Sequence, residues 1–404
     1  MREKTRNFAH LALNGPIPCR DDAIAMTPVA MTPVATTPVA TTPVATTIDP
    51  RGKRDRRRFA QIAASLLLAA VLLTGSAAAI ATEADWRQFK LDFIEQDGRV
   101  VDAGQDGISH SEGQGYAMLL AVYYGDRAAF EQIWQWTRKN LQVRGDNLLS
   151  WSWSPQSGIK DKNNASDGDL IVAWALLRAS AKWHVPDYLQ ASRNIARDIR
   201  EKLILKSSHG LVLLPGAEGF HKPEGDSINL SYWVFPALDE IGQADPAPEW
   251  EELSNNGVAI LQYAHFGRWK LPPDWLVLTE KVVPSDGLSE LFGYNALRIP
   301  LYLLWSRRET AELLEPYREF WGYFSGARFL PSWTNLKNDS VDSYDASAGI
   351  HRVAQWVLLY PRTPGPAKLP PGEKQGYYSS VLLLLTDMAM SERRAAQRAH
   401  ARAP

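Results

Sequence analysis

Apolar side chains recur every three to four residues along most of the chain after Trp86, which is the period of an α-helix that turns one face to a core. Glycine and proline interrupt this pattern and separate the helices that it predicts. The predicted helices are Gly113–Tyr124, Ala128–Leu141, Asp169–Lys182, Asp187–Leu205, Trp250–Phe266, Ser289–Trp305, Glu309–Phe324 and Tyr377–Ala389.

Alternation typical of strands is scarce, and Gly210–Pro215 is its best example. A parallel α/β fold needs a strand between successive helices, and few are seen. We therefore predict an all-α fold of about ten to twelve helices. Long connections that carry tryptophan favour a helical toroid over a compact bundle, in which short loops join the helices.

Four parts are predicted along the chain. Residues 1–58 contain a five-residue repeat rich in Thr and Pro and then a basic run, which predicts disorder. Residues 59–81 follow that basic run with a short apolar stretch and a small-residue ending, as in a secretory signal. Residues 82–390 form one domain, and residues 391–404 form a disordered basic tail.

The secretory signal has one alternative, a retained membrane anchor. Its strongly apolar part, Leu66–Leu73, is shorter than the roughly 20 residues that span a bilayer. We expect cleavage after Ala79 or Ala81 and a periplasmic or secreted product. A signal so far from Met1 is explained if translation begins downstream, for example at Met26 or Met31.

Charge and composition exclude several classes of function. The 404 residues include 45% apolar and 22% charged side chains, as in a globular protein. The formal net charge is −1, but between residues 59 and 390 only 30 basic side chains face 39 acidic ones, a net charge of −9. We therefore expect no nucleic-acid partner. The only cysteine, Cys19, precedes the domain, and the eight histidines are scattered, so we expect neither a metal site nor a cofactor.

The segment Ser109–Met118 is the first that could carry chemistry. Ser109 or Ser111 could cap a helix, which would place Glu112 in its first turn. Glu112 could simply complement the helix dipole there. However, Gly113 and Gly115 are poor helix formers, and they indicate that something approaches the backbone closely.

Asn163–Trp174 is the second such segment. It carries Asp167 and Asp169 at the start of a predicted helix, where capping needs only one of them. A carboxylate among amide and hydroxyl groups can hold a sugar or a water. Trp151 and Trp153 lie just upstream in a polar loop, and flat aromatic faces of this kind stack on ligands.

The third segment, Phe292–Trp305, begins with Tyr294, Asn295 and Arg298 ahead of an apolar run. Arg298 could pair with a buried carboxylate or orient one in a site.

Together these segments resemble glycoside hydrolase family 8, and among its members most closely the endoglucanases encoded with bacterial cellulose synthases. The resemblance rests on Ala165–Asp169, followed by an apolar helix through Trp183, and on Ser111–Met118. It covers the chain from about Trp86 to Ala389 and implies an (α/α)6 barrel, inverting hydrolysis of β-1,4-glucans and no metal.

The resemblance also implies roles for residues. Glu112 matches the family's proton donor, and Asp167 matches the aspartate that binds and distorts the sugar. Asn295 departs from the pattern, because many members carry a catalytic base, Asp, at that place, and an amide cannot take a proton at neutral pH. Some members carry Asn there and recruit another carboxylate, for which Asp167, Asp226, Asp286 and Glu290 are the candidates here. The remaining residues expected to contact substrate are Tyr116, Trp151, Trp153, Asp169, Trp233, Tyr294 and Arg298.

An inverting hydrolase needs its acid and base about 6.5–9.5 Å apart, with water between them. Glu112 would have to stay protonated near neutral pH, which requires an apolar or anionic neighbourhood. Other readings stay open: the same fold acting on chitosan, xylan or mixed-linkage glucan, or a non-catalytic glucan-binding protein that has lost its base at Asn295. The expected partners are a β-glucan and the cellulose synthesis machinery, and we expect a monomer.

Overall fold

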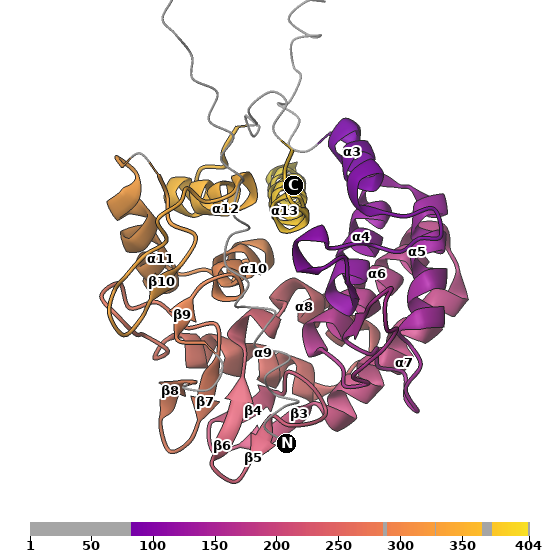
Figure 1. Ribbon diagram of the computed structural model, residues 1–404, viewed down its shortest axis with the longest axis horizontal. Coiled ribbons are helices and arrows are strands. Elements are labelled where there is room, and N and C mark those ends of the chain that lie inside the picture. The colour runs from indigo at the N-terminus through magenta and orange to yellow at the C-terminus, as the bar shows by residue number, and fades with distance from the viewer. Residues whose placement is uncertain (1–81, 286–288, 328, 366–373, 403–404) are drawn as a thin grey trace, which may run out of the picture. The chain divides into compact units, whose positions relative to one another are not determined.

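The computed structural model describes residues 82–285, 289–327, 329–365 and 374–402 (Figure 1). The predicted extension 1–58 and signal 59–81 lie outside the described residues, and so does Asp286. The helices are α3 (Glu83–Phe93), α4 (Ser111–Tyr124), α5 (Arg127–Asn140), α6 (Ser166–Trp183), α7 (Pro186–Lys202), α8 (Phe235–Ala244), α9 (Pro248–Leu261), α10 (Ile299–Ser306), α11 (Ala311–Phe324), α12 (Ala348–Leu359) and α13 (Tyr377–Arg402).

An inner ring of helices forms the core. Each helix of this ring contacts the next: α4 contacts α6, α6 contacts α8, α8 contacts α10, and α10 contacts α13. The contact between α13 and α4 closes the ring (Figure 1). Around it, α5 packs on α4, α7 on α6, and α9 on α8, while α11 packs on α12, which contacts α10 and α13. The described domain is therefore the helical toroid that the sequence predicts.

Sequence explains which helices are inside. The helix α4 reads SEGQGYAMLLAVYY and α10 reads IPLYLLWS, and most side chains of both are buried. A helix that is apolar on all sides must be surrounded by protein. By contrast, α7 buries one stripe that includes Ile195 and Ile199 and exposes charged residues such as Arg193 and Arg197, as a helix on the outer layer does.

Short antiparallel strands join the ends of the helices. They are β1 (Ser109–His110), β2 (Ser152–Trp153), β3 (Ile204–Ser207), β4 (Gly210–Leu213), β5 (His221–Lys222), β6 (Gly225–Ile228), β7 (Leu276–Leu278), β8 (Val282–Pro284), β9 (Leu291–Phe292) and β10 (Thr334–Asn335). The strands β5 to β8 form one sheet in sequence order, and β1 pairs with β2, β3 with β4 and β9 with β10. The β1–β2 pair matters most here, because it brings the Trp153 loop to the start of α4.

Most predicted helices are confirmed, and β4 matches the predicted strand. Two predictions are wrong. Ser289–Trp305 is not one helix: it contains β9, a 3₁₀ turn η3 (Ala296–Arg298) and then α10, which begins with Pro300 in its first turn. The predicted disordered tail continues α13 to Arg402. Its first charged residues have partners, because Glu392 forms an ion pair with Arg178 and accepts a hydrogen bond from the Trp305 indole.

Two glycines allow α4 and α6 to approach each other closely. A Cβ atom on Gly168 would lie 2.7 Å from Ser111 Cβ and 2.8 Å from the Glu112 backbone nitrogen. A Cβ atom on Gly115 would lie 2.9 Å from Ile171 Cγ2. Gly115 therefore faces α6, and the group that approaches the backbone closely there is a neighbouring helix.

We predict that Gly168→Ala destabilises the protein by about 1–3 kcal/mol through overpacking and moves Glu112 relative to α6, which lowers activity. The matched control is Gly322→Ala on the outer helix α11, where a Cβ atom would meet only Leu358 Cδ2, at 3.8 Å. This control should stabilise the fold by about 0.5–1 kcal/mol. Thermal unfolding checks both signs, and equal effects of the two substitutions would contradict the packing argument.

Candidate active site

Glu112 lies in the first turn of α4, with its side chain 18% exposed. The helix begins at His110, whose Nδ1 accepts a hydrogen bond from the Gly113 backbone nitrogen at 3.0 Å. His110, and neither Ser109 nor Ser111, is thus the capping residue. Because Nδ1 is an acceptor, the neutral ring carries its proton on Nε2, which lies 3.5 Å from Asp102 Oδ2.

Asp167 lies in the first turn of the neighbouring helix, α6. Its side chain is buried, and its Oδ1 accepts a hydrogen bond from the Gly168 backbone nitrogen at 2.8 Å. Burial raises the pKa of Asp167 to about 7. The carboxyl group therefore gains or loses its proton close to neutral pH.

Arg298 joins these two carboxyl groups. It comes from η3, far away in the sequence, and is 3% exposed. Its Nη1 forms an ion pair with Glu112 Oε1, and its Nη2 lies 3.7 Å from Asp167 Oδ2. Two first-turn carboxyl groups of adjacent inner helices thus share one guanidinium group.

Further contacts hold Arg298 in place. Its Nη1 donates to the Tyr116 hydroxyl at 3.2 Å, and its Nη2 donates to Ser231 Oγ at 3.1 Å and to Asn295 Oδ1 at 3.1 Å. Tyr116 is buried, and its hydroxyl also bonds to Tyr302 and lies 3.4 Å from Glu112 Oε1. Sequence reasoning identified Tyr116, Asn295 and Arg298, and missed Ser231 and Tyr302.

The surroundings of Glu112 differ from the expected ones. The sequence led us to expect an apolar or anionic neighbourhood, whereas Glu112 contacts a cation, Arg298. A guanidinium ion favours the ionised form of a carboxyl group, and burial favours the neutral form. Glu112 therefore lies in a mixed environment, with a cationic partner and partial burial.

The predicted aromatic residues divide into two groups. Tyr294 and Trp153 are half-buried, with Tyr294 against Tyr378 at 5.7 Å between ring centroids and Trp153 under the Arg99 guanidinium at 5.3 Å. Trp151 is buried, and its backbone oxygen accepts a hydrogen bond from the Ser111 nitrogen at 3.0 Å. Trp151 thus ties its loop to α4.

Trp233 is wrongly predicted as a substrate contact. It is fully buried, and its indole nitrogen donates to the Leu253 carbonyl at 3.0 Å. A Cβ atom on Gly257 would lie 2.4 Å from its ring, so Trp233 fills the space between α8 and α9. Tryptophan in this chain more often builds the core than a binding surface, and the sequence pattern did not separate the two uses.

Asp169 is also wrongly predicted as a substrate contact. It is fully buried, and its two oxygens accept hydrogen bonds from the Leu149 backbone nitrogen at 2.8 Å and from Asn164 Nδ2 at 2.7 Å. Burial raises the pKa of Asp169 to about 7. Asp169 therefore fixes both ends of the loop that carries Trp151 and Trp153.

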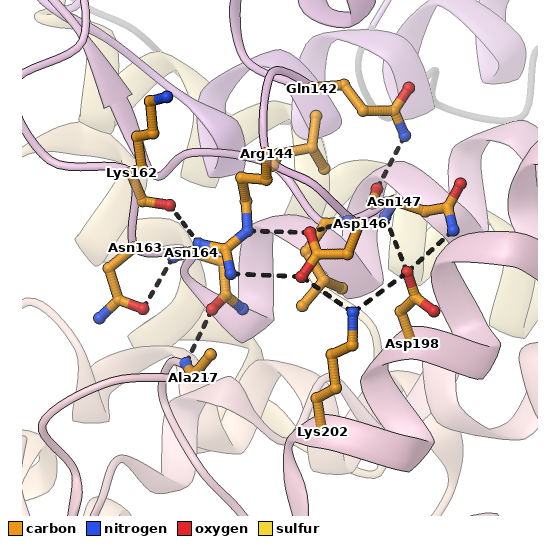
Figure 2. A network of polar contacts seen from close by, with 12 residues as sticks. Gln142, Arg144, Asp146, Asn147, Lys162, Asn163, Asn164, Asp198, Lys202 and Ala217 are labelled. Atoms are coloured by element: carbon orange, nitrogen blue, oxygen red, sulfur yellow. Dashed lines mark hydrogen bonds and ion pairs between the residues drawn. The ribbon is translucent and has the colours of Figure 1, made fainter.

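A polar network holds the same loop from its other side (Figure 2). Asp146 accepts hydrogen bonds from Arg144 at 3.0 Å and from Lys202 of α7 at 3.0 Å, while Asp198 accepts one from the Asn147 backbone nitrogen at 2.7 Å. Arg144 also donates to the Lys162 carbonyl, and Asn164 Oδ1 accepts a bond from the Ala217 nitrogen at 2.8 Å. Figure 2 shows these contacts converging on the loop, which is therefore anchored to α7.

Asp274 was also missed, although it supports the predicted Asn295 directly. It is 1% exposed, and its Oδ1 accepts hydrogen bonds from the backbone nitrogens of Gly293, Asn295 and Ala296. Asp274 stands in a loop without helical periodicity, so nothing in the local sequence connects it to Asn295.

The sequence profile of glycosyl hydrolases family 8 matches residues 58–392. This chain belongs to that family. It is similar to a probable endoglucanase of Novacetimonas hansenii, with 38% identity over 76% of this chain and 90% of that protein. Solved family structures also resemble it and confirm the (α/α)6 barrel.

Two of those structures illustrate the similarity. An endoglucanase from Komagataeibacter sucrofermentans is 38% identical, covers 77% of this chain and 98% of its own, and has a TM-score of 0.71. The endo-β-1,4-glucanase CMCax from Acetobacter xylinum is 36% identical, covers 78% of this chain and 99% of its own, and has a TM-score of 0.70. No group of three His, Cys, Asp or Glu gathers as a metal site within the described part of this family member.

We predict that Arg298→Lys lowers kcat by about 10²-fold. Lysine keeps the charge, but its single ammonium group cannot contact both carboxyl groups and the Tyr116, Ser231 and Asn295 oxygens together. Arg308→Lys is the control, because Arg308 pairs with Asp239 away from Glu112 and Asp167. Release of reducing ends from carboxymethyl-cellulose measures the effect, and wild-type kcat in Arg298→Lys would refute the bridging role.

Proposed function

We propose that this chain is a secreted endo-β-1,4-glucanase that cleaves β-1,4-glucan chains with inversion of the anomeric configuration. The observation that carries this proposal is the cluster of Glu112, Asp167 and Arg298 at the start of two adjacent inner helices. The names of its relatives support the glucan as substrate, because proteins that are 36–38% identical to this chain are called endoglucanase or endo-β-1,4-glucanase.

Glu112 acts as the general acid. It gives its proton to the oxygen between two sugars while that bond breaks. Before this step Glu112 must be protonated, so the Arg298 guanidinium must turn to other acceptors. Its Nη2 already bonds to Ser231 and Asn295 and lies near Asp167, which offers the charge an alternative partner. Substrate binding thus exchanges the Glu112–Arg298 ion pair for contacts with the sugar.

The base must be another carboxylate, because Asn295 carries an amide. Among the candidates, Asp226 bonds to His221 at 2.5 Å in the β5–β6 hairpin, and Glu290 pairs with Lys337. Asp167 belongs to the cluster, and burial raises its pKa to about 7, near the value that suits a general base. Asp167 is therefore the described candidate that fits best, both to hold the sugar and to deprotonate water. The remaining candidate, Asp286, lies outside the described residues.

We predict that Glu112→Gln abolishes cleavage, with a loss of at least about 10²–10⁴-fold in kcat, and leaves binding of cello-oligosaccharides intact. Glutamine keeps the shape and hydrogen-bonding capacity of the side chain but has no acidic proton. Reducing-end release and calorimetric binding of cellopentaose measure the two properties separately. A fully active Glu112→Gln enzyme would end this assignment.

We also predict that Asn295→Asp preserves or raises turnover, because an Asp oxygen can still accept the Arg298 Nη2 hydrogen bond and adds a carboxylate that can take a proton. Asn295→Ala is the comparison, since it removes the Arg298 contact and should lower turnover. A collapse of turnover in Asn295→Asp would mean that the amide itself is needed, for instance to hold water for a different base.

One observation favours a second function. The amide at Asn295 is what a non-catalytic glucan-binding protein that has lost its base would carry. Such a protein would bind glucan without producing new reducing ends, so one assay of the wild type separates the two. Running that assay on cellulose, chitosan, xylan and mixed-linkage glucan also identifies the preferred chain.

Secretion, a monomeric state and cooperation with cellulose synthesis complete the proposal. The signal pattern at residues 59–81 supports secretion, and the resemblance to endoglucanases encoded with bacterial cellulose synthases supports the cooperation. Within the described ranges no helix is long and apolar enough to cross a bilayer. Sequencing the N-terminus of the mature protein tests cleavage near Ala79–Ala81, and light scattering tests the monomer.

A further inference from the structure

Asp274 clamps the segment that leads into η3. Its Oδ1 accepts three backbone hydrogen bonds, from Gly293 at 3.1 Å, Asn295 at 3.1 Å and Ala296 at 2.7 Å. Its own backbone nitrogen donates to the Leu291 carbonyl at 2.7 Å, and Ser289 Oγ lies 3.5 Å from its Oδ2. One buried side chain thus fixes the whole approach to the Asn295 turn.

These hydrogen bonds leave the Asn295 side chain free for the active site. Helix starts leave backbone N–H groups without partners, and an Asn at that place usually caps them with its own side chain. Asn295 precedes η3 but makes no such cap. The N–H groups of Leu297 and Arg298 bond to the Gly293 and Asn295 carbonyls, and Asp274 accepts the N–H groups of Asn295 and Ala296. Asn295 Oδ1 therefore bonds to Arg298 Nη2.

The clamp is close-packed and electrostatically linked to the site. A Cβ atom on Gly293 would lie 2.9 Å from Asp274 Oδ2, so only glycine allows this approach. Burial is the largest cause that raises the pKa of the Tyr232 phenol, and the charges of Asp167 and Asp274 raise it further. Both carboxylates are therefore close enough to act on one ring. The contacts of Asp274 are with the backbone of the Asn295 turn, so it would act on Arg298 through that turn.

We propose that Asp274 is a positioning residue: its ionised carboxylate holds the turn that presents Asn295 and Arg298 to Glu112 and Asp167. This inference rests on the proposed hydrolysis. The carboxylate accepts three N–H groups on one oxygen, and protonation weakens it as an acceptor. A protonated Asp274 therefore loosens the turn without any change in the substrate-contacting groups.

The stability of the fold and the proposed role respond to pH with opposite signs. Burial raises the pKa of Asp274 from 3.8 to about 6. Its contribution to stability is therefore present below pH 3.8 and is lost as the pH rises through about 6. Catalysis, in contrast, needs the ionised form and fails as the pH falls below about 6. The phenols of Tyr232, Tyr294 and Tyr378, which sense this charge, have raised pKa values and stay neutral throughout.

Asp274→Asn tests the proposal on the full mature chain. The neutral isostere should lower kcat on cellopentaose about tenfold or more. In the plot of kcat against pH, it should remove the part of the acid limb, the fall of kcat at low pH, that lies near pH 6. The melting temperature at pH 7 should be unchanged or higher. Cellopentaose is used because it does not titrate. A residue with a merely structural role would instead lower the melting temperature and leave kcat unchanged.

Asp126→Asn is the matched control. Asp126 also caps a backbone N–H, that of Ala129 at 3.1 Å, but at the start of the outer helix α5. Burial opposes its ionisation, yet hydrogen bonds from Lys90, Ala129 and Trp86 hold the pKa of Asp126 below its usual value, so its charge stabilises the fold. This control should lower the melting temperature and keep wild-type kcat and acid limb.

Wild-type kcat and acid limb in Asp274→Asn would overturn the inference. If that variant does not fold, Ser289→Ala replaces it: removing the hydroxyl donor raises the pKa of Asp274, so the acid limb should move to higher pH, and an unmoved limb would overturn the inference. The proposed hydrolysis fails separately, because then the wild type itself releases no reducing ends.

Discussion

One guanidinium group that contacts two carboxyl groups, the buried Asp167 and the partly buried Glu112, is the constraint on which this site depends. Removing a charge from water costs several kcal/mol unless a partner compensates it. Glu112 and Asp167 come from neighbouring helices, and Arg298 reaches both from a third element. The glycine contact between α4 and α6 sets the spacing of the carboxyl groups, and the turn before α10 sets the position of the guanidinium. Displacing any of these elements would leave a charge in the interior without its partner.

The sequence predicted most of the helices, though not α3, α8 or α12, and the acidic members of the site, because these leave local patterns. Helical periodicity located most inner and outer helices, and the first-turn carboxyl groups Glu112 and Asp167 stood out against glycine and serine. Long-range contacts were not accessible in the same way. Asp274 acts on Asn295 across 21 positions of the chain, and no periodicity encodes that pairing. The segment Ser289–Trp305 is not one helix, because it contains β9 and because the N–H groups of Gly293, Asn295 and Ala296 bond to this distant side chain.

Residue type alone led to wrong predictions where one kind of side chain can either contact substrate or hold the fold together. Asp169 lies only two residues from Asp167, but its oxygens point to Leu149 and Asn164 and hold a loop. Its partner network around Asp146 and Asp198 lies against α7 (Figure 2). The aspartates Asp167, Asp169 and Asp274 all have raised pKa values from burial, so each of them weakens the fold when it ionises near neutrality. The site thus trades stability for charges that are held in place.

The closure of the helical ring also has a consequence for the order of assembly. The last helix, α13, returns to α3 and α4, and Tyr377 at its start is packed against Gly113 beside the acid. Contacts between residues so distant in sequence form late, after the loop-closure entropy has been overcome. A ribosome-bound chain that has not yet formed α13 would therefore have Glu112 without the neighbouring Tyr377. We therefore expect the enzyme to become active only after α13 has been synthesised and has packed against α4.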